Sequence, residues 1–255
     1  MAELTRAPIE VRGVSKRFRV DGHVVEALHD ASLVADEGQF VSLIGPSGCG
    51  KSTLLNIVSG LMRPDSGHVL IYGHDEASRL GQIGYMPQKD LLLPWRTLLE
   101  NLLLGPEIRG RDLDEARTEA IDLMERFGLA GFEDSLPATL SGGMRQRAAL
   151  LRTLMCHQDV LLLDEPLGAL DALTRREMRQ WLLEVWQTFR KTMIFVTHDV
   201  DEAIYLADRV FVMSSRPGTI LNELQIELPR PRSEDITRGS AFLDYRMVLL
   251  ESLGV

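Results

Sequence analysis

Four short apolar runs lie in the middle and later parts of the chain, at residues 40–44, 160–163, 193–196 and 210–213. Hydrophobic residues follow one another within these runs instead of alternating with polar ones. That pattern is typical of parallel strands whose two faces are both covered. Helical patterns separate the runs along the chain. The sequence therefore predicts a doubly wound α/β fold around a parallel sheet.

Two longer segments, residues 112–127 and 171–189, have apolar residues at spacings of three and four, which is the period of an amphipathic helix. The predicted apolar faces consist of Leu113, Ala116, Ala120, Leu123 and Phe127 in the first segment, and of Met178, Trp181, Leu182, Val185 and Phe189 in the second. Residues 97–155 have helical patterns and no evident strand. We therefore expect a helical subdomain over residues 97–155, inserted into the α/β core.

The two ends of the chain have different patterns. Residues 9–35 indicate short strands, and Asp21-Gly22 between them is a strong signal for a hairpin turn. Residues 217–255 are expected to form a C-terminal tail, in which a Pro/Arg-rich stretch at 228–232 precedes a helix near 240–252. We predict a single domain over residues 1–255.

The composition narrows the partners and the compartment. The net charge of −9 and the pI of about 5.2 argue against a general nucleic-acid binder, because such proteins usually carry a basic excess. The two cysteines, Cys49 and Cys156, fit no metal-ligand spacing, and we expect free thiols in a reducing compartment. The first residues lack an apolar signal core, and no apolar run approaches the ~18 residues of a membrane span, so we expect a cytosolic chain.

A glycine-rich stretch follows the first apolar run and precedes a helix-like run at residues 53–61; it matches the phosphate-loop pattern G-x-x-x-x-G-K-[ST]. Glycines let successive backbone N–H groups surround phosphate oxygens, and a helix N-terminus adds positive partial charge. Lys51 is expected to reach the β- and γ-phosphates of a nucleotide and Ser52 to bind Mg²⁺, the alternative being an ordinary glycine-rich turn. The residues expected to bind ATP here are Gly45, Pro46, Ser47, Gly48, Cys49, Gly50, Lys51, Ser52 and Thr53.

Two carboxylates follow the second apolar run, at the sheet edge where ligands bind in such folds. Asp164 is expected to hold Mg²⁺, directly or through water. Glu165 is expected to act as a general base on the attacking water, or to orient it. The alternative is a strand end with two solvated acids, which the preceding phosphate loop makes a weaker interpretation.

Residues 140–147 read Leu-Ser-Gly-Gly-Met-Arg-Gln-Arg and open a helix. Ser141 is a good N-cap, and Gly142 and Gly143 expose backbone amides that could bind an anion. The alternative is an ordinary capped helix start, but such a start does not need two glycines, each of which costs about 1 kcal/mol of helix stability.

Together, the phosphate loop and the segment 140–147 resemble the ATP-binding-cassette (ABC) ATPases. The resemblance covers residues 9–215 closely and the tail more loosely. It implies a RecA-like parallel-sheet core with an N-terminal antiparallel β-subdomain and an inserted α-helical subdomain. It also implies that Ser141, Gly142 and Gly143 bind the γ-phosphate of an ATP held by a second subunit, so that a homodimer forms the complete ATPase.

Further residues match the family's motifs in order. Gln88 matches the Q-loop, which contacts Mg²⁺ and the transport partner, and Asp171, in the segment 168–171, matches the D-loop at the dimer interface. His198 matches the switch histidine, implied to contact the γ-phosphate with catalytic effect alongside Glu165 and Lys51, although a lone histidine is more often structural. Phe18 stands where the family places an aromatic ring that stacks on adenine; the alternative is a core phenylalanine.

Residues 92–97, 196–203 and 213–218 narrow the resemblance to bacterial importer ATPases of the nitrate, sulfonate and taurine group, some of whose relatives serve pyrimidine thiamine precursors. The resemblance implies ATP and Mg²⁺ as cofactors, membrane permease subunits as partners, an indirect link to a solute-binding protein, no nucleic acid, and a peripheral location at the cytoplasmic face of the inner membrane. The alternatives are a soluble ABC ATPase acting on DNA or ribosomes, which typically has coiled coils or a second cassette, and a non-catalytic cassette, against which the intact Glu165 and His198 argue.

Two smaller features each allow two interpretations. Cys49 is either a small residue that fills a tight turn or a reactive thiol beside Lys51. The leucine-rich stretch around Pro94-Trp95 either packs within the helical subdomain or partly lines a groove for the permease, with Trp95 as the exposed anchor. For most of these leucines we favour internal packing.

Overall fold

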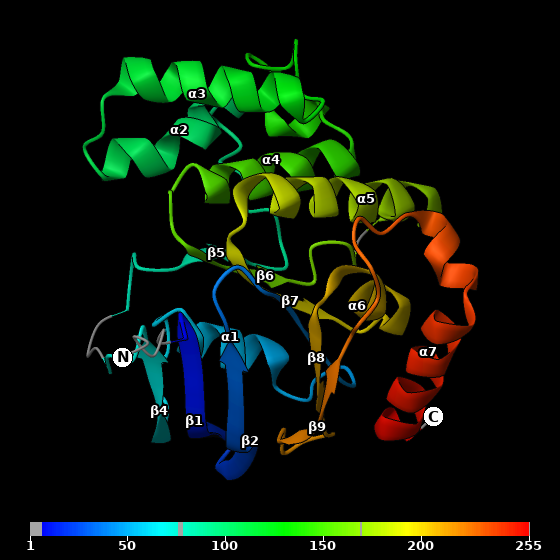
Figure 1. Cartoon of the computed structure of the whole chain (residues 1–255). Helices are drawn as coiled ribbons and strands as arrows, with labels where there is room; N and C mark the ends of the chain where they lie inside the picture. The colour runs from blue at the N-terminus through cyan, green and yellow to red at the C-terminus, as the bar shows by residue number, and fades with distance from the viewer. Residues whose placement is uncertain (1–6, 76–78, 169, 255) are drawn as a thin grey trace, which may run out of the picture.

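A computed structural model describes residues 7–75, 79–168 and 170–254 (Figure 1). Its centre is a six-stranded sheet in the order β5-β6-β7-β3-β8-β9, in which all neighbouring strands are parallel except β8 and β9. The strands are β3 (Phe40–Ile44), β5 (Gly84–Met86), β6 (Val160–Asp164), β7 (Thr192–Thr197), β8 (Arg209–Met213) and β9 (Ile220–Gln225). The predicted parallel α/β sheet is confirmed, and β5 and β9 are strands that the apolar runs did not indicate.

The six-stranded sheet separates two hydrophobic cores, which explains why its central strands β6, β7, β3 and β8 are mostly apolar. Along β7, Met193 and Phe195 belong to one core, while Ile194 and Val196 belong to the other. The first core lies under most of the helices, and the second lies between the sheet, α1 (Lys51–Val58) and the N-terminal strands. Alternate side chains therefore point to opposite faces of the sheet, and both faces are buried.

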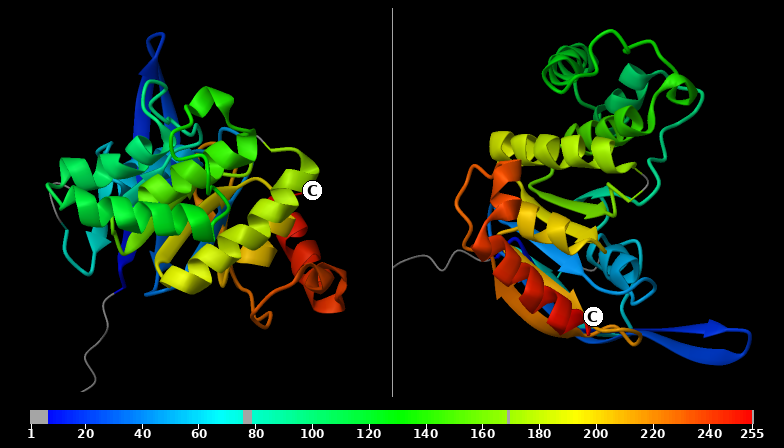
Figure 2. Two further views of the ribbon diagram at one scale, coloured as in Figure 1. Left: turned by 90° about the horizontal axis from the view of Figure 1, so that it is seen from above. Right: turned by 90° about the vertical axis from the view of Figure 1, so that its right-hand side faces the viewer.

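A second sheet has the order β2-β1-β4 and is antiparallel, which confirms the expected β-subdomain. Its strands are β1 (Ile9–Val20), β2 (His23–Ala35) and β4 (Ser66–Ile71). The prediction of short strands over residues 9–35 is wrong, because β1 and β2 form one long hairpin whose irregular register breaks the polar–apolar alternation. Asp21 and Gly22, both at positive φ, make the turn, and the hairpin projects from the body of the molecule (Figure 2).

Residues 97–155 contain α2 (Leu98–Ile108), α3 (Leu113–Arg126) and α4 (Gly142–Leu154), joined by a short 3-10 turn and no strand. Helices α2 and α3 lie farthest from the two sheets, with α4 and α5 (Ala172–Phe189) beneath them (Figure 1). The predicted apolar faces of α3 and α5 are buried except for Leu113, which is 47% exposed, and Phe189, which is partly buried.

The tail packs on the α/β core. After β9, a 3-10 segment (Glu234–Arg238) leads to α7 (Ser240–Leu253), the helix predicted near residues 240–252, which contacts α6 (Val200–Leu206) and β8. Arg232 is 2% exposed, and its guanidinium donates hydrogen bonds to the carbonyl oxygens of Ile204, Tyr205 and Ala207 at the end of α6. The orphan carbonyls of a helix end thus gain a buried donor from the tail.

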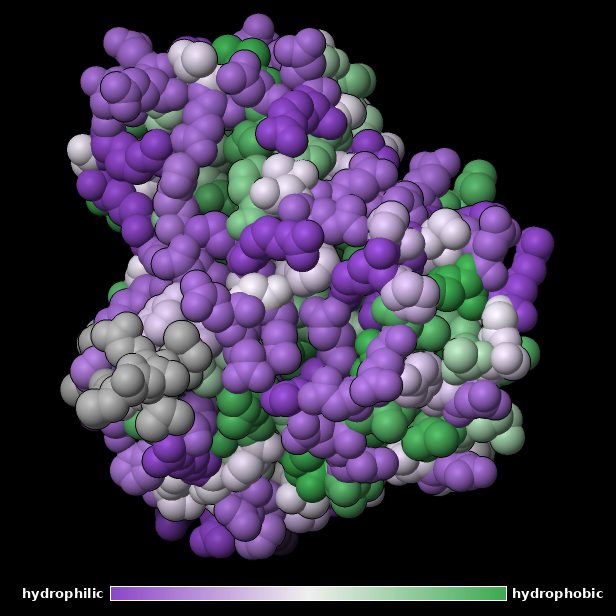
Figure 3. Space-filling model, in the orientation of Figure 1, coloured by the Kyte–Doolittle hydropathy of each residue, from purple (hydrophilic) through white to green (hydrophobic). Residues whose placement is uncertain are grey.

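Within the described part of the chain, every helix is too short or too polar to cross a bilayer. One face of the molecule is mainly hydrophilic, with apolar residues in separate areas (Figure 3).

Candidate functional site

A cavity of about 410 Å³ opens between the phosphate loop (residues 45–52) and the part of the β1–β2 hairpin next to its turn. Its lining includes the apolar side chains of Phe18, Val20 and Val25 and also the charged residues Lys51 and Glu165. A planar base and a chain of phosphates need these two kinds of wall. The full lining is Phe18, Val20, Val25, Ala27, Ser47, Gly48, Gly50, Lys51, Ser52, Thr53, Gln88, Glu165 and Arg216.

The phosphate loop connects β3 to α1 and has glycines where another residue would be strained or would clash. Gly48 and Gly50 have φ of 75° and 116°, and a Cβ at Gly50 would lie 2.8 Å from the carbonyl oxygen of Ala27. Gly50 is the N-cap of α1 and has no capping side chain. The first N–H groups of α1 therefore remain available to an anion in the cavity.

Lys51 is turned into its own loop. Its Nζ donates to the carbonyl oxygens of Gly45 at 2.7 Å and Pro46 at 3.0 Å, and the side chain is nearly buried. Cys49 Sγ lies 3.8 Å from this Nζ, and Cys49 is 1% exposed. That burial supports the interpretation of Cys49 as a filler of the turn over that of a reactive thiol.

Asp164 and Ser52 face each other at the ends of β6 and the phosphate loop. Ser52 Oγ donates to Asp164 Oδ1 at 3.1 Å, and the Tyr85 hydroxyl donates to Oδ2 at 3.5 Å. Burial raises the pKa of Asp164, and the Ser52 hydrogen bond opposes that shift. Burial also raises the pKa of Tyr85, so its hydroxyl keeps its proton.

The oxygen atoms of Ser52 and Asp164 suit Mg²⁺, which binds few protein ligands and completes its shell with water and phosphate oxygens. Among the described residues, no cluster of three or more His, Cys, Asp or Glu side chains could hold a metal by itself.

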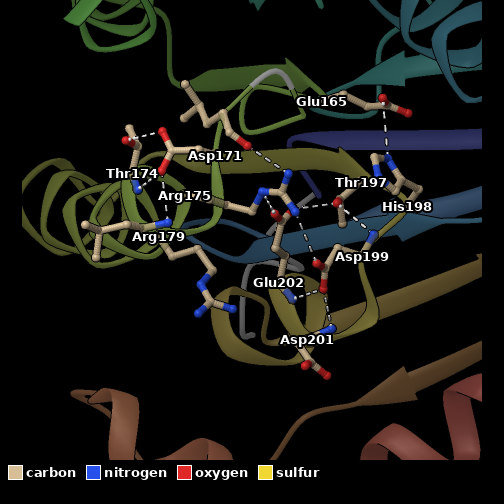
Figure 4. Close-up of polar contacts among 12 residues, drawn as sticks. Glu165, Asp171, Thr174, Arg175, Arg179, Thr197, His198, Asp199, Asp201 and Glu202 are labelled. Atoms are coloured by element: carbon tan, nitrogen blue, oxygen red, sulfur yellow. Dashed lines mark hydrogen bonds and ion pairs between the residues drawn. The ribbon is translucent and has the colours of Figure 1, made fainter. Parts of the chain in front are cut away.

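Gln88 and His198 come from distant segments of the chain, and both contact the carboxylate of Glu165 (Figure 4 shows His198 and Glu165). Gln88 Nε2 donates to Glu165 Oε2 at 3.2 Å, and His198 Nδ1 lies 3.6 Å from the same oxygen. The parallel pairing of β6 and β7 brings the segments together, since the Glu165 N–H donates to the Val196 carbonyl at 3.0 Å. Glu165 itself has a φ of 47°, an uncommon backbone conformation that places its side chain at the cavity.

The predicted interface residues lie elsewhere. Ser141 caps α4 by accepting from the Met144 N–H at 3.3 Å, and neither it nor Gly142 or Gly143 lines the cavity. A Cβ at Gly143 would lie 2.9 Å from Thr174 Cγ2, so this glycine also permits close packing of α4 against α5. Asp171 is the exposed N-cap of α5 and also lies outside the cavity lining; its motif neighbour Ala169 is outside the described residues.

The structure adds residues that sequence reasoning missed. Val20, Val25 and Ala27 line the cavity, and Phe18 is half-buried beside them instead of lying in either core. Arg216 follows β8, and its Nε and Nη2 donate to the Gly48 carbonyl at 3.2 and 2.9 Å. The available signal was its place after an apolar strand, at the same sheet edge as the phosphate loop.

Comparison with known proteins gives consistent matches. A family model described as ABC transporter matches residues 28–168. The chain is 41% identical to the formylaminopyrimidine import ATP-binding protein ThiZ of Halalkalibacterium halodurans, over 93% of this chain and 94% of the relative. It is 42% identical to the aliphatic sulfonates import ATP-binding protein SsuB of Bacillus cereus, over 95% and 94%. A dimeric ATP-binding cassette in a post-hydrolysis state bound to ADP and Pi superposes with a TM-score of 0.75 at 31% identity, covering 87% of this chain and 100% of the other.

Proposed function

The chain belongs to the ABC transporter family as an ABC-type ATPase, and we propose that it is the ATP-binding subunit of an importer, working as a homodimer beneath a membrane permease. The observation that carries most weight is the meeting of Gln88, Glu165 and His198 beside the phosphate loop. A phosphate-binding loop, a carboxylate and two groups that hold the carboxylate are the parts that phosphoanhydride hydrolysis requires.

In this proposal, adenine stacks on Phe18 and the phosphates lie over the phosphate loop. Lys51 exchanges the carbonyl oxygens of Gly45 and Pro46 for β- and γ-phosphate oxygens, a change that its flexible stem permits. Thr53 and the neighbouring backbone N–H groups at the start of α1 bind the remaining phosphate oxygens.

Hydrolysis forms a bond from water to the γ-phosphorus and breaks the bond to the departing ADP. Glu165 takes a proton from the attacking water, while Gln88 and His198 hold its carboxylate in place. Ser52, Asp164 and Gln88 would hold Mg²⁺, which when bound neutralises part of the phosphate charge. The side chain of His198 is half-exposed, and in this proposal it contacts the γ-phosphate.

The second subunit supplies the remaining contacts. Ser141, Gly142 and Gly143 lie outside their own cavity at the start of α4, with N–H groups suited to an anion, and Asp171 is exposed nearby. The chain has one phosphate loop and one such segment, so two chains are needed for two complete sites. The dimeric cassette with ADP and Pi supports this arrangement.

The names of the relatives support the proposed partners and substrate. Names that specify import of aliphatic sulfonates and of formylaminopyrimidine support a small solute such as a sulfonate, taurine, nitrate or a pyrimidine thiamine precursor, delivered by a solute-binding protein. The chain would then lie at the cytoplasmic face of the membrane. Trp95 is 73% exposed beside a hollow of about 360 Å³ that Leu103 and Leu113 also line, which supports a permease contact there.

A mixing experiment tests the shared site. A Lys51→Ala chain and a Ser141→Arg chain, both also carrying Glu165→Gln, should each occlude little ATP alone. Their heterodimer has one site with both lesions and one site without either, so it should occlude one nucleotide. Heterodimers recovered through two affinity tags but holding no ATP would contradict the shared site. Co-purification of the wild-type chain with nucleic acid or ribosomes, and not with a membrane protein, would contradict the importer.

A further inference from the structure

The first turn of α5 contacts segments that belong to different parts of the proposed dimer. Asp171 caps α5, accepting from the N–H groups of Leu173 and Thr174 and from the Thr174 hydroxyl. Thr174 packs against Gly143, at the start of α4. The residue one position further along, Arg175, reaches towards the loop that contains His198 (Figure 4).

Arg175 bridges two loops with one guanidinium. Its Nη2 donates to the carbonyl oxygen of Leu170 at 2.9 Å, directly before Asp171. Its Nη1 lies 3.9 Å from Asp199 Oδ2, and its Nε lies 3.7 Å from Glu202 Oε1. A movement of Leu170 would therefore shift Arg175 relative to the carboxylates of Asp199 and Glu202.

Glu202 in turn is linked by hydrogen bonds to the two neighbours of His198 in the chain, Thr197 and Asp199. Its Oε2 accepts from the Thr197 hydroxyl at 2.5 Å, and the same hydroxyl accepts from the Asp199 N–H at 3.0 Å. The Glu202 side chain is 4% exposed. Burial raises the pKa of Glu202 to about 7, and the Thr197 hydrogen bond opposes that shift.

The contacts of Arg175 with the carboxylates are loose. Distances of 3.7 and 3.9 Å exceed the 2.7–2.9 Å that is typical of a charge-assisted hydrogen bond. Among the described residues, the buried Arg175 Nε has no hydrogen-bond partner. The charged groups that act on Glu202 are Asp199 on its own segment and Arg175 and Arg179 on α5. The pair is therefore able to tighten when the Leu170 loop moves.

We propose that Arg175 is a positioning residue that couples the loop ending at Asp171 to the switch histidine, His198, through the buried side chain of Glu202. The inference rests on the proposed homodimer, because the second subunit would move the Asp171 loop. When that subunit engages, Arg175 closes on Glu202 and Asp199, and His198 is set against Glu165 and the γ-phosphate. Hydrolysis then depends on completion of the dimer.

The first test replaces Arg175 with methionine, which keeps the length of the side chain and removes the guanidinium. We expect kcat to fall about tenfold while KM for ATP stays within about twofold, because Arg175 does not line the nucleotide cavity. Arg175→Lys keeps the charge without the planar fork and should be intermediate. The matched control is Arg176→Met, whose side chain is 58% exposed and which should keep wild-type kcat.

The second test combines Arg175→Met with Glu202→Gln. The two substitutions should be strongly non-additive, with the double variant no slower than the slower single one. The ratio of wild-type kcat to Glu202→Gln kcat should rise with pH through about 7, where Glu202 ionises and pairs with Arg175. That rise should be absent when both chains also carry Arg175→Met.

Three outcomes would overturn the inference: Arg175→Met and Arg175→Lys with wild-type kcat, losses that multiply in the double variant, or a loss of ATP affinity equal to the loss of kcat. If Arg175→Met does not fold, Arg175→Lys is used in the same cycle. ATP-driven dimerisation of the Glu165→Gln chain distinguishes failure of the proposed function from failure of the role of Arg175. A wild-type chain that neither dimerises nor hydrolyses ATP contradicts the proposed function, whereas normal dimerisation with an uncoupled cycle contradicts only the role of Arg175.

Discussion

Glu165 and His198 share one oxygen contact across neighbouring strands: His198 Nδ1 lies 3.6 Å from Glu165 Oε2, the atom that also accepts from Gln88. Contacts within the protein thus hold the Glu165 carboxylate at the cavity. Its side chain is 19% exposed, so water can reach it. These properties suit a base that must meet a water molecule in a defined orientation.

Glu165→Gln should therefore keep ATP binding and lose hydrolysis. The amide cannot take a proton from water, and we expect the rate of phosphate release to fall by a factor on the order of 10² or more. The phosphate loop and the Ser52–Asp164 pair are unchanged, so ATP affinity should remain near that of the wild type. The control is Glu177→Gln, an exposed position on α5. Phosphate release near the wild-type rate would remove Glu165 from this role.

Arg216 should contribute to nucleotide affinity through the phosphate loop. Its two hydrogen bonds to the Gly48 carbonyl hold the loop, and its side chain lines the cavity. Arg216→Ala should raise the Kd for ATP about fivefold, which corresponds to roughly 1 kcal/mol. Calorimetric titration measures this, with the exposed Arg63→Ala as control. Equal Kd values for the two variants would show that Arg216 acts on neither the loop nor the nucleotide.

Glu202 should make stability depend on pH. Its pKa is raised by burial from 4.5 to about 7, so the folded chain keeps a proton that the unfolded chain releases between these values. This contribution to the free energy of unfolding is complete below pH 4.5 and is lost as pH rises through about 7. Relative to Glu202→Gln, wild-type stability should fall by about 2–3 kcal/mol between pH 4.5 and 8. A constant difference over this range would contradict the buried, proton-holding carboxyl.

Arg232 should anchor the tail. It is a buried cation whose hydrogen bonds go to carbonyl oxygens of α6 and of residues 226 and 228 instead of to a carboxylate. Burial lowers its pKa to about 10. Arg232→Met leaves those carbonyls without a donor and should cost about 3 kcal/mol of unfolding free energy in urea. Arg238→Met, whose side chain is 85% exposed, should cost almost nothing. Similar losses in both variants would contradict the anchor.

Much of this fold could be predicted because the four central strands of the larger sheet are apolar on both faces. That property made β3, β6, β7 and β8 visible as runs. It failed for β5, which has three residues, and for β9, an exposed edge strand with polar residues such as Asn222 and Glu223. The length of the β1–β2 hairpin was also missed, because bulges interrupt its alternation.

The parts of the site that could be predicted are the motifs that directly follow a single strand. The phosphate loop and the pair Asp164–Glu165 follow apolar runs directly, so their meeting at one sheet edge follows from parallel topology. The roles of Arg175, Arg216 and Arg232 could not be read in this way. Each arginine acts on a carbonyl or carboxylate that is distant in the sequence or depends on a loop conformation, which periodicity does not encode.

We predict that Trp95 contacts the proposed permease. Most neighbouring leucines are core residues, since Leu92, Leu98, Leu99, Leu102 and Leu103 are all below 9% exposed. Trp95 itself is 73% exposed, and Leu113 is exposed beside the same hollow. A large aromatic side chain left outside a well-packed helical layer is a reasonable interface anchor.

Trp95→Ala should therefore weaken co-purification with the proposed permease, or uncouple transport from ATP hydrolysis, while leaving the Kd for ATP and the melting temperature unchanged. Removal of a central aromatic anchor typically costs about 2 kcal/mol or more of binding free energy, which is roughly thirtyfold in affinity. Leu221→Ala is the matched control, because Leu221 is an apolar residue 57% exposed on β9, an element far from α2 in the chain. A Trp95→Ala chain that assembles and transports like Leu221→Ala would exclude this surface, and one that unfolds would contradict the exposure of the ring.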